Sequence, residues 1–134
     1  AAWREETKSA GFGWVYTNRF SKLDRSESAS ASNIGSPLMA EAVALFLAQQ
    51  QALALGFKKL HFASDSQLLI KALTSESPQK ELYGILQDIL WLSNDFDEIS
   101  FSFVSREKNS RADALAKSAL NSAFIVPASV PVSV

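Results

Sequence analysis

The sequence changes repeatedly between the two hydrophobic periods that distinguish strands from helices. Residues 99–104 alternate strictly between apolar and polar, which predicts a strand with one buried face. Between Ser36-Pro37 and Gly56, apolar residues recur at spacings of three and four, and a Ser cap, an early Pro and a terminal Gly are typical of a helix. The full order of expected elements is β-β-α-β-α-α-β-α, which predicts a mixed α/β fold with helices packed on one sheet.

Shorter patterns of the same kind place the remaining elements. Strands are expected at residues 11–17 and 59–64, with a weaker, solvent-facing strand at 28–32. Further helices are expected at 66–74, from Ser77-Pro78 to about residue 92, and from Arg111 to about residue 123 after a Ser110 cap. Residues 1–123 are therefore expected to form one domain. Residues 124–134 have two prolines and no hydrophobic period, and we expect an extended or disordered tail there.

The residue types narrow the kinds of site that the chain can hold. The chain has no cysteines and one histidine, His61. The absence of cysteines excludes disulfides, thiolate zinc sites and cysteine nucleophiles, and it favours an intracellular (cytoplasmic or nuclear) location over secretion. No apolar run approaches the ~18 residues of a membrane span, and the N-terminus has no signal-peptide pattern. Any metal site must therefore be built mostly of carboxylates, which favours Mg²⁺ or Mn²⁺.

Three carboxylates stand at the ends of expected elements, and each has a structural explanation beside a functional one. Asp65 follows a strand, where ligands gather in α/β sheets, but Asp65 or Ser66 is equally placed to cap the next helix. Asp113 fits a capping box that begins at Ser110. Glu41 lies in the first turns of its helix, where acids suit the helix dipole. It also shares a face with apolar residues, so it needs a partner or a metal ion.

The three carboxylates and their neighbours resemble the ribonuclease H superfamily in order and spacing. The matching segments are Pro37-Leu38-Met39-Ala40-Glu41-Ala42, Ala63-Ser64-Asp65-Ser66-Gln67 and Asn109-Ser110-Arg111-Ala112-Asp113-Ala114-Leu115-Ala116. The resemblance extends over residues 1–120 and looks strongest to the ribonuclease H-like domain of plant retroelement-type (non-LTR) reverse transcriptase proteins. It implies a ribonuclease H-like fold with a single mixed β-sheet flanked by helices, in which the first central strand is largely missing at the N-terminus.

The resemblance also implies an activity and the residues that perform it. The family cleaves the RNA strand of RNA–DNA hybrids and leaves a 3′-hydroxyl and a 5′-phosphate, so a metal-dependent endonuclease is expected here. Glu41, Asp65 and Asp113 are the implied catalytic residues and metal ligands, for two Mg²⁺ or Mn²⁺ ions. Two such ions roughly 4 Å apart activate a water and stabilise the leaving oxygen. The expected partner is an RNA–DNA hybrid or another nucleic acid, and no binding to a membrane is expected.

The implied substrate contacts are polar residues beside the carboxylates. Basic side chains near Asp113 are expected to hold phosphates, and polar residues after Asp65 to contact sugar or phosphate. These contact residues are Ser66, Gln67, Arg106, Lys108, Asn109 and Arg111. The alternative for the basic ones is a solvated loop. The net charge is −1, and the helix that ends near residue 92 has no basic cluster. We therefore expect the domain to bind nucleic acid weakly and in a salt-sensitive manner.

The chain departs from the family pattern at two positions. The family's fourth acid, an Asp near the end of the first strand, would be the residue just before Ala1, and Glu5 and Glu6 fall in the following turn. The loop before the last helix has no histidine, which would slow turnover rather than abolish metal chemistry. The first-strand slot would then be filled by preceding residues, by Phe124-Ile125-Val126 or by a second chain. We expect a monomer, with oligomers or strand exchange as the alternative.

Two other functions compete with that of a nuclease. Gly11-x-Gly13 begins a dinucleotide fingerprint, but no helix or third glycine follows, which argues against a Rossmann fold. The stronger rival is a catalytically inactive ribonuclease H-fold module that serves as a nucleic-acid or protein interaction domain. The pI near 5.8, the missing first Asp and the missing loop histidine favour this rival. Three acids in register favour the enzyme.

Overall fold

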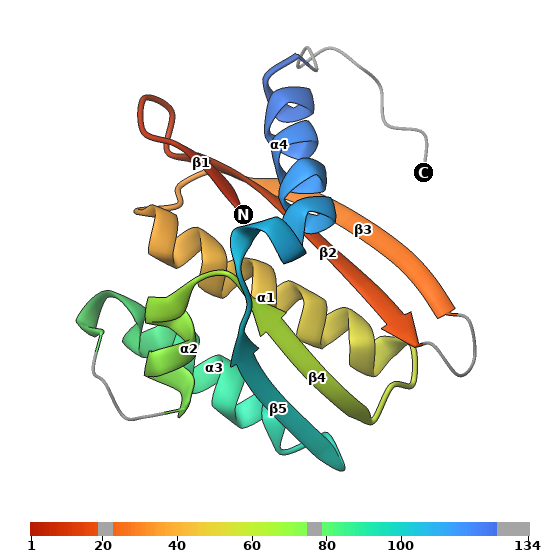
Figure 1. The fold of residues 1–134 in the computed structure, drawn as a ribbon. Coiled ribbons are helices and arrows are strands. Elements are labelled where there is room, and N and C mark those ends of the chain that lie inside the picture. The colour runs from red at the N-terminus through yellow and green to blue at the C-terminus, as the bar shows by residue number, and fades with distance from the viewer. Residues whose placement is uncertain (19–22, 75–78, 126–134) are drawn as a thin grey trace.

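The computed structural model describes residues 1–18, 23–74 and 79–125, and the strands in these segments form two hydrogen-bonded ladders (Figure 1). The first ladder is antiparallel and has the order β1 (Ala2–Arg4), β2 (Ser9–Asn18) and β3 (Leu23–Ala31). The second is a parallel pair, β4 (Lys59–Ser64) and β5 (Glu98–Phe103). Parallel strands need a crossover connection, and helices supply it here.

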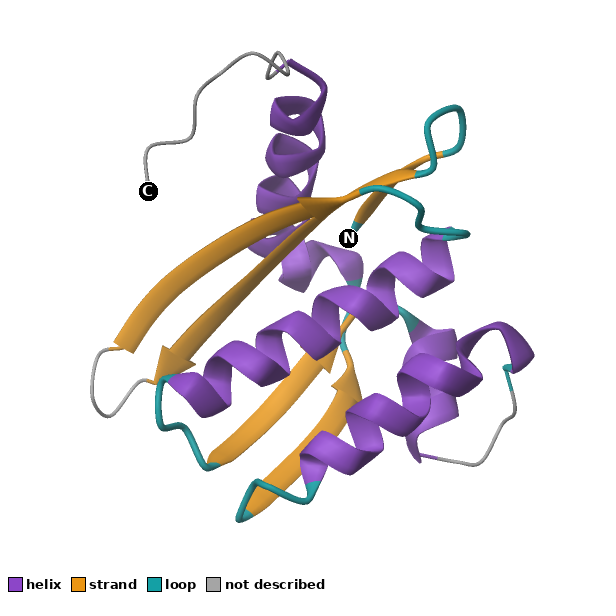
Figure 2. Cartoon of the chain, turned by 180° about the vertical axis from the view of Figure 1, so that it is seen from behind, coloured by secondary structure: helices purple, strands orange, loops and turns teal. Residues whose placement is uncertain are grey.

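Helices cover both faces of the strands. They are α1 (Pro37–Ala54), α2 (Gln67–Thr74), the 3-10 turn η1 (Lys80–Leu82), α3 (Tyr83–Ser93), the 3-10 turn η2 (Arg106–Asn109) and α4 (Ser110–Ile125). Figures 1 and 2, which are opposite views, show α1, α2 and α3 on one side of the strands and α4 on the other. The result is a layered α/β arrangement. Within the described segments, no helix combines the length and the apolar character needed to cross a lipid bilayer.

The start and end of α1 follow the signals in the sequence. Ser36 has an extended backbone, and its hydroxyl accepts a hydrogen bond of 3.0 Å from the Met39 amide, while Pro37 occupies the first turn. Gly56 follows the helix with a φ of +85°, a conformation that favours glycine. The expected helix between Ser36 and Gly56 is therefore confirmed.

The alternation of side chains along β2 decides which helix packs on which face. Ala10 and Phe12 point toward α1, where they form a buried cluster with Ala40 and Ala44. Gly11 points the opposite way, and α4 passes directly over it. Because successive residues of a strand face opposite sides, this one strand supports both helix layers.

The main core lies between α1, α2 and α3. Its buried residues are Ala42, Leu45, Leu69, Leu82, Leu86 and Ile89. Phe62 of β4 and Phe101 of β5 stack with their ring centroids 5.8 Å apart and pack against this core. The inward residues of α3 recur at spacings of three and four, so the opposite stripe of that helix faces solvent.

The mixed α/β fold expected from the sequence is confirmed, with three differences of detail. β1 was absent from the expected order because three residues are too few to show a period. β3 is nine residues long rather than the short segment 28–32, because pairing with β2 holds polar residues that have no apolar period. The expected single sheet is present as two ladders: all three residues of β1 pair with β2, and no ladder among the described strands joins β1 to β4.

The end of α4 also differs from the expectation. The helix continues to Ile125, so Phe124 and Ile125 are helical and do not belong to an extended tail or fill a strand slot. No Gly or Pro interrupts the chain before Pro127, and the residue before a proline is the natural place for a helix to stop. Residues 126–134 and the expected Ser77-Pro78 helix start lie outside the described residues.

Candidate metal and nucleic-acid site

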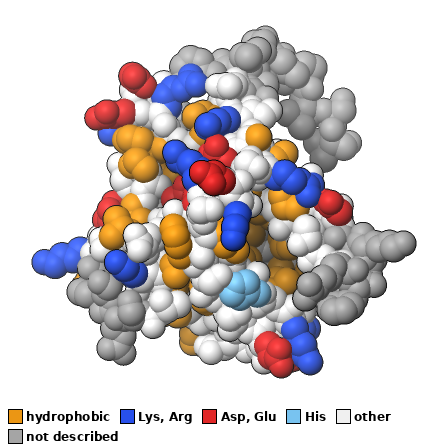
Figure 3. Space-filling model, viewed as in Figure 1, with side chains coloured by type: hydrophobic (Ala, Val, Ile, Leu, Met, Phe, Trp, Pro, Cys, Tyr) orange, Lys and Arg blue, Asp and Glu red, His pale blue; other side chains and the backbone are white. Residues whose placement is uncertain are grey.

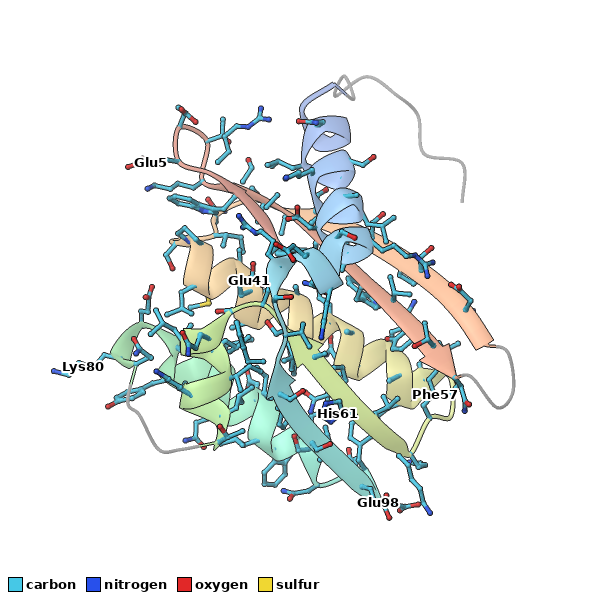
Figure 4. All side chains as sticks on the ribbon, in the orientation of Figure 1. Glu5, Glu41, Phe57, His61, Lys80 and Glu98 are labelled. Atoms are coloured by element: carbon cyan, nitrogen blue, oxygen red, sulfur yellow. The ribbon has the colours of Figure 1, made fainter. Side chains whose placement is uncertain are left out.

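Glu41 and Asp65 lie close together, where β4 ends and α1 begins. Glu41 is in the second turn of α1, and its side chain is 20% exposed. Asp65 directly follows β4, and its side chain is 11% exposed. Figure 4 shows Glu41 near the middle of the molecule, beside the segment that leads from β5 into α4. Two carboxylates from different elements therefore share a largely buried position.

The electrostatic environment of Glu41 opposes its ionisation. Burial raises the pKa of the Glu41 carboxyl above its ordinary value, and the negative charge of Asp65 raises it further. The Ala1 ammonium, whose nitrogen is 2.9 Å from Glu41 Oε1, and the Arg106 guanidinium lower that pKa. Burial outweighs both cations. A carboxylate in this position would be stabilised by a further positive charge.

Asp65 does not cap α2, so one of its two sequence explanations is removed. The Ser66 hydroxyl accepts a hydrogen bond of 3.4 Å from the Leu69 amide, and the Ser66 carbonyl accepts one from the Ile70 amide. The contact of Asp65 is with Arg106, whose Nε lies 3.7 Å from Asp65 Oδ2. The Asp65 carboxylate therefore remains available to a ligand.

Asp113 lies in the first turn of α4, but not in the expected capping box. Ser110 is already helical, with φ −61° and ψ −35°, because η2 runs directly into α4. A capping residue needs an extended backbone, which Ser105 has instead. The Asp113 carboxylate is 3.0 Å from Lys117 Nζ, one turn later on the same helix. The expected Ser110 cap is therefore wrong, and the capping explanation of Asp113 falls with it.

The three carboxylates do not form one compact cluster. In the part of the chain that the structure describes, no group of three or more His, Cys, Asp or Glu side chains is close enough to share a metal ion. Glu41 and Asp65 interact electrostatically with each other, whereas Asp113 pairs with Lys117. The structure thus brings two of the three expected ligands together and leaves the third with its own cation.

The expected basic contacts divide in the same way. Arg106 is 78% exposed and reaches toward Asp65 from η2, and Lys108 is exposed in the same turn. Arg111 instead pairs with Asp24 of β3 through two hydrogen bonds of 2.7 and 3.1 Å, which lower the pKa of Asp24. Figure 3 shows acidic and basic side chains crowded together in the middle of this face, above the single histidine. Through its two hydrogen bonds to Asp24, Arg111 also links α4 to β3.

The remaining expected contacts are polar residues around the carboxylates. Gln67 is exposed at the start of α2, and Asn109 is half-buried at the end of η2. The Ser66 hydroxyl is occupied by its capping bond. His61 lies on β4, where its two ring nitrogens are each 2.6 Å from a serine hydroxyl of β5, so it behaves as a strand residue.

Gly11 and Gly13 position this site, a role that was not among those expected from the sequence. A Cβ at Gly11 would lie 2.0 Å from the Ala116 carbonyl oxygen, and one at Gly13 would lie 2.4 Å from the Ala112 carbonyl oxygen. Their absent side chains let α4 lie directly on β2, which sets the place of Asp113. The signal was present in the sequence, because two glycines at i and i+2 share one face of a strand and indicate close backbone approach.

Replacing Glu41 with Gln tests the burial of this carboxyl. The folded protein holds the Glu41 proton more tightly than the unfolded chain does. The free energy of unfolding is therefore highest below the pKa of Glu41 in the unfolded chain, near 4.5, and it decreases as the pH rises through the higher pKa of the folded protein. Without divalent metal, Glu41→Gln should therefore raise the melting temperature at neutral pH, and the two proteins should converge in acid. Circular dichroism melts across this range measure it. Exposed Glu6→Gln should show no such trend, and a destabilised Glu41→Gln at neutral pH would contradict the prediction.

Comparison with solved structures identifies the class of fold. The chain superposes on ribonuclease H1 from the halophilic archaeon Halobacterium salinarum NRC-1 with a TM-score of 0.82 and 30% identity, covering 90% of this chain and 92% of that one. An LC11 ribonuclease H1 in complex with an RNA/DNA hybrid matches with a TM-score of 0.80 and 23% identity, over 92% of this chain and 94% of that one. The fold is therefore that of ribonuclease H.

Two further comparisons complete the assignment. The N-terminal ribonuclease H domain of rv2228c from Mycobacterium tuberculosis shares the fold at 22% identity and a TM-score of 0.79, with 91% and 89% of the two chains covered. Comparison with curated proteins gave no match. The family model described as reverse transcriptase-like matches residues 1–119. The chain belongs to this reverse transcriptase-like family.

Proposed function

We propose that this domain is a metal-dependent endonuclease that cleaves the RNA strand of RNA–DNA hybrids. The observation that carries the proposal is the pair of largely buried carboxylates, Glu41 and Asp65, which meet beside the end of β4. Neither has a helix-capping bond in the structure, and the carboxyl ends of strands are where α/β proteins bind ligands. The ribonuclease H fold and its likeness to a ribonuclease H1 at 30% identity support the same chemistry.

The donor set fits a hard divalent cation such as Mg²⁺ or Mn²⁺. Glu41 and Asp65 offer carboxylate oxygens, the ligands these ions prefer, and their mutual repulsion would be relieved by a cation between them. Asp113 is the proposed third ligand, once released from Lys117. When bound, the metal supplies Lewis acidity and a water nucleophile that is active at neutral pH.

The other residues of the site position the substrate. Arg106 projects from η2 beside Asp65, and Lys108 is exposed in the same turn. Both would hold backbone phosphates without reading sequence. Gln67 and Asn109 offer amide groups to sugar and phosphate oxygens. Arg111 contributes less because Asp24 already engages its guanidinium. With so few cations, binding of the hybrid should be weak and salt-sensitive.

The N-terminus offers a direct test of the metal site. The Ala1 nitrogen is 2.9 Å from Glu41 Oε1, so a residue joined to that nitrogen begins beside the carboxylate pair. A variant with Asp added before Ala1 should bind Mg²⁺ about 10-fold more tightly than its matched variant with Asn, because each added carboxylate strengthens a hard-cation site. NMR titration measures the binding, and shifts should centre on Glu41 and Asp65.

The same two variants separate the enzyme from its rival. The Asp variant should cleave a labelled RNA–DNA hybrid faster than the Asn variant and leave duplex DNA intact. If neither variant shifts with millimolar Mg²⁺ or Mn²⁺, or neither cleaves the hybrid, the nuclease proposal fails. The second candidate function, a non-cleaving interaction module, would then stand; the separation of Asp113 from the other two carboxylates favours it.

A further inference from the structure

The outer face of α3 exposes large apolar side chains. Trp91 is 78% exposed, Tyr83 is 54% exposed and Leu90 is 45% exposed. An open depression follows the same stretch and is lined by Gln87, Asp88, Leu90, Trp91, Ser93 and Asn94. On the inner face of the helix, Leu86 and Ile89 are buried against α1. The helix therefore exposes large apolar side chains on its outer face, and exposed apolar surface of this kind is typical of an interaction site.

Acidic residues precede and follow Trp91 along the chain. Between Lys80 and Arg106 the sequence has five Asp or Glu residues and no Lys or Arg. Asp88 lies one turn before Trp91, and Asp95 lies four residues after it. Asp97 follows in the turn to β5, and Glu98 is the first residue of that strand. None of the ion pairs formed by the described residues includes any of these four acids. Their charge is therefore available to a partner.

The position of these acids is unfavourable for the isolated domain. The C-terminal end of a helix carries partial negative charge, which favours cations there. α3 has no basic residue in its last turn, and Asp95 and Asp97 follow it directly. Lys58 approaches this end, but its Nζ donates to the Asp95 carbonyl at 3.4 Å rather than to a carboxylate. Lys58 thus places one cation at this end of the helix, while the Asp95 and Asp97 carboxylates have no ion pair among the described residues.

We propose that the outer face of α3 binds a basic, amphipathic peptide segment of a protein partner. Arg or Lys side chains of that segment would pair with Asp88 and Asp95 and lie over the Trp91 indole, where aromatic rings attract cations. Its apolar side chains would cover Leu90 and Tyr83. Interface hot spots are enriched in Trp and Arg, so Trp91 contacted by an Arg of the partner is a suitable anchor.

The charge decides between this partner and two others. The acids near Trp91 would repel a nucleic-acid backbone, so this face is not a continuation of the basic η2 region that is proposed to bind nucleic acid. A second copy of the chain has a net charge of −1, so it complements this acidic face less well than a basic peptide does. None of the residues proposed for the nuclease site lies on α3, so this surface does not depend on the proposed nuclease function.

The proposal is tested with two peptides of about 15 residues that carry Leu at helical spacing. In one the polar positions are Arg and Lys, and in the other they are Glu. The basic peptide should shift the amide signals of α3 and the Trp91 indole N–H, and its affinity should fall as NaCl rises from about 0.05 to about 0.5 M. The acidic peptide should cause no shift.

Three variants locate the binding. Trp91→Ala should weaken the basic peptide at least about 10-fold, and Asp88→Lys should weaken it several-fold. Leu68 is an apolar residue of α2 that is 52% exposed, and Leu68→Ala is the matched control, which should not change the affinity for the basic peptide. Equal binding of both peptides, or shifts confined to other elements, would overturn the proposal. Shifts of α3 with an RNA–DNA hybrid, or self-association abolished by Trp91→Ala, would assign the face to nucleic acid or to a second copy instead.

Discussion

Asp65→Asn is expected to reduce cleavage of an RNA–DNA hybrid by about 100-fold or more, measured on the variant that carries Asp before Ala1. The change keeps the shape of the side chain but removes the charge that would hold a divalent cation. Losses of this size are typical when one preorganised electrostatic contact is removed from a reaction centre. Initial rates at saturating Mg²⁺ measure the effect.

The structure predicts that this variant remains folded. Ser66, not Asp65, caps α2, and the Asp65 side chain has only a long contact of 3.7 Å with Arg106 among its ion pairs. Its melting temperature should therefore stay close to that of the parent. Glu6→Gln is the control, because it removes an exposed carboxylate from the β1–β2 turn and should leave the rate unchanged. A fully active Asp65→Asn protein would show that this carboxylate does not serve the reaction.

Gly13→Ala is expected to destabilise the domain by about 3 kcal/mol, the upper part of the range for overpacking. The new Cβ would lie 2.4 Å from the Ala112 carbonyl oxygen and 2.7 Å from the Ala116 amide nitrogen. Both are backbone atoms, so no side-chain rotation relieves the contact and α4 must move away from β2. Urea unfolding monitored by circular dichroism measures the loss, and Gly11→Ala should be at least as severe.

Gly84→Ala provides the opposite result with the same chemical change. A Cβ at Gly84 would meet no atom within 4 Å, and the residue lies in α3. Alanine is favoured over glycine in helices by up to about 1 kcal/mol, so this variant should be unchanged or slightly more stable. Equal effects of Gly84→Ala and Gly13→Ala would show that backbone entropy, rather than the close approach of α4, controls both positions.

Local patterns in the sequence were sufficient for most of the fold. The Ser36 cap, Pro37 and Gly56 predicted α1 because capping and positive-φ preferences act within a few residues. Strict alternation predicted β5 for the same reason. β1 and most of β3 were missed because pairing with β2, a contact between distant residues, holds them in place.

The candidate site divides along the same line. The order and spacing of Glu41, Asp65 and Asp113 in the sequence predicted the class of fold, and the match to the reverse transcriptase-like family is consistent with it. Which carboxylates meet was decided by tertiary structure. Only the folded structure brings Glu41 of α1 beside Asp65 at the end of β4, and only the approach of α4 to the β2 glycines sets the place of Asp113.

The partners of the charged groups and the exposed face of α3 also became known only from the tertiary structure. Sequence alone made Asp65 and Ser66 equal candidates for a helix cap, whereas the fold assigned the cap to Ser66 and the Arg106 contact to Asp65. Sequence likewise placed Trp91 within an expected helix, and only packing showed that its side chain faces solvent. The physical reason is common to both: a periodic pattern states which residues share a face, but partners distant in the chain decide what that face meets.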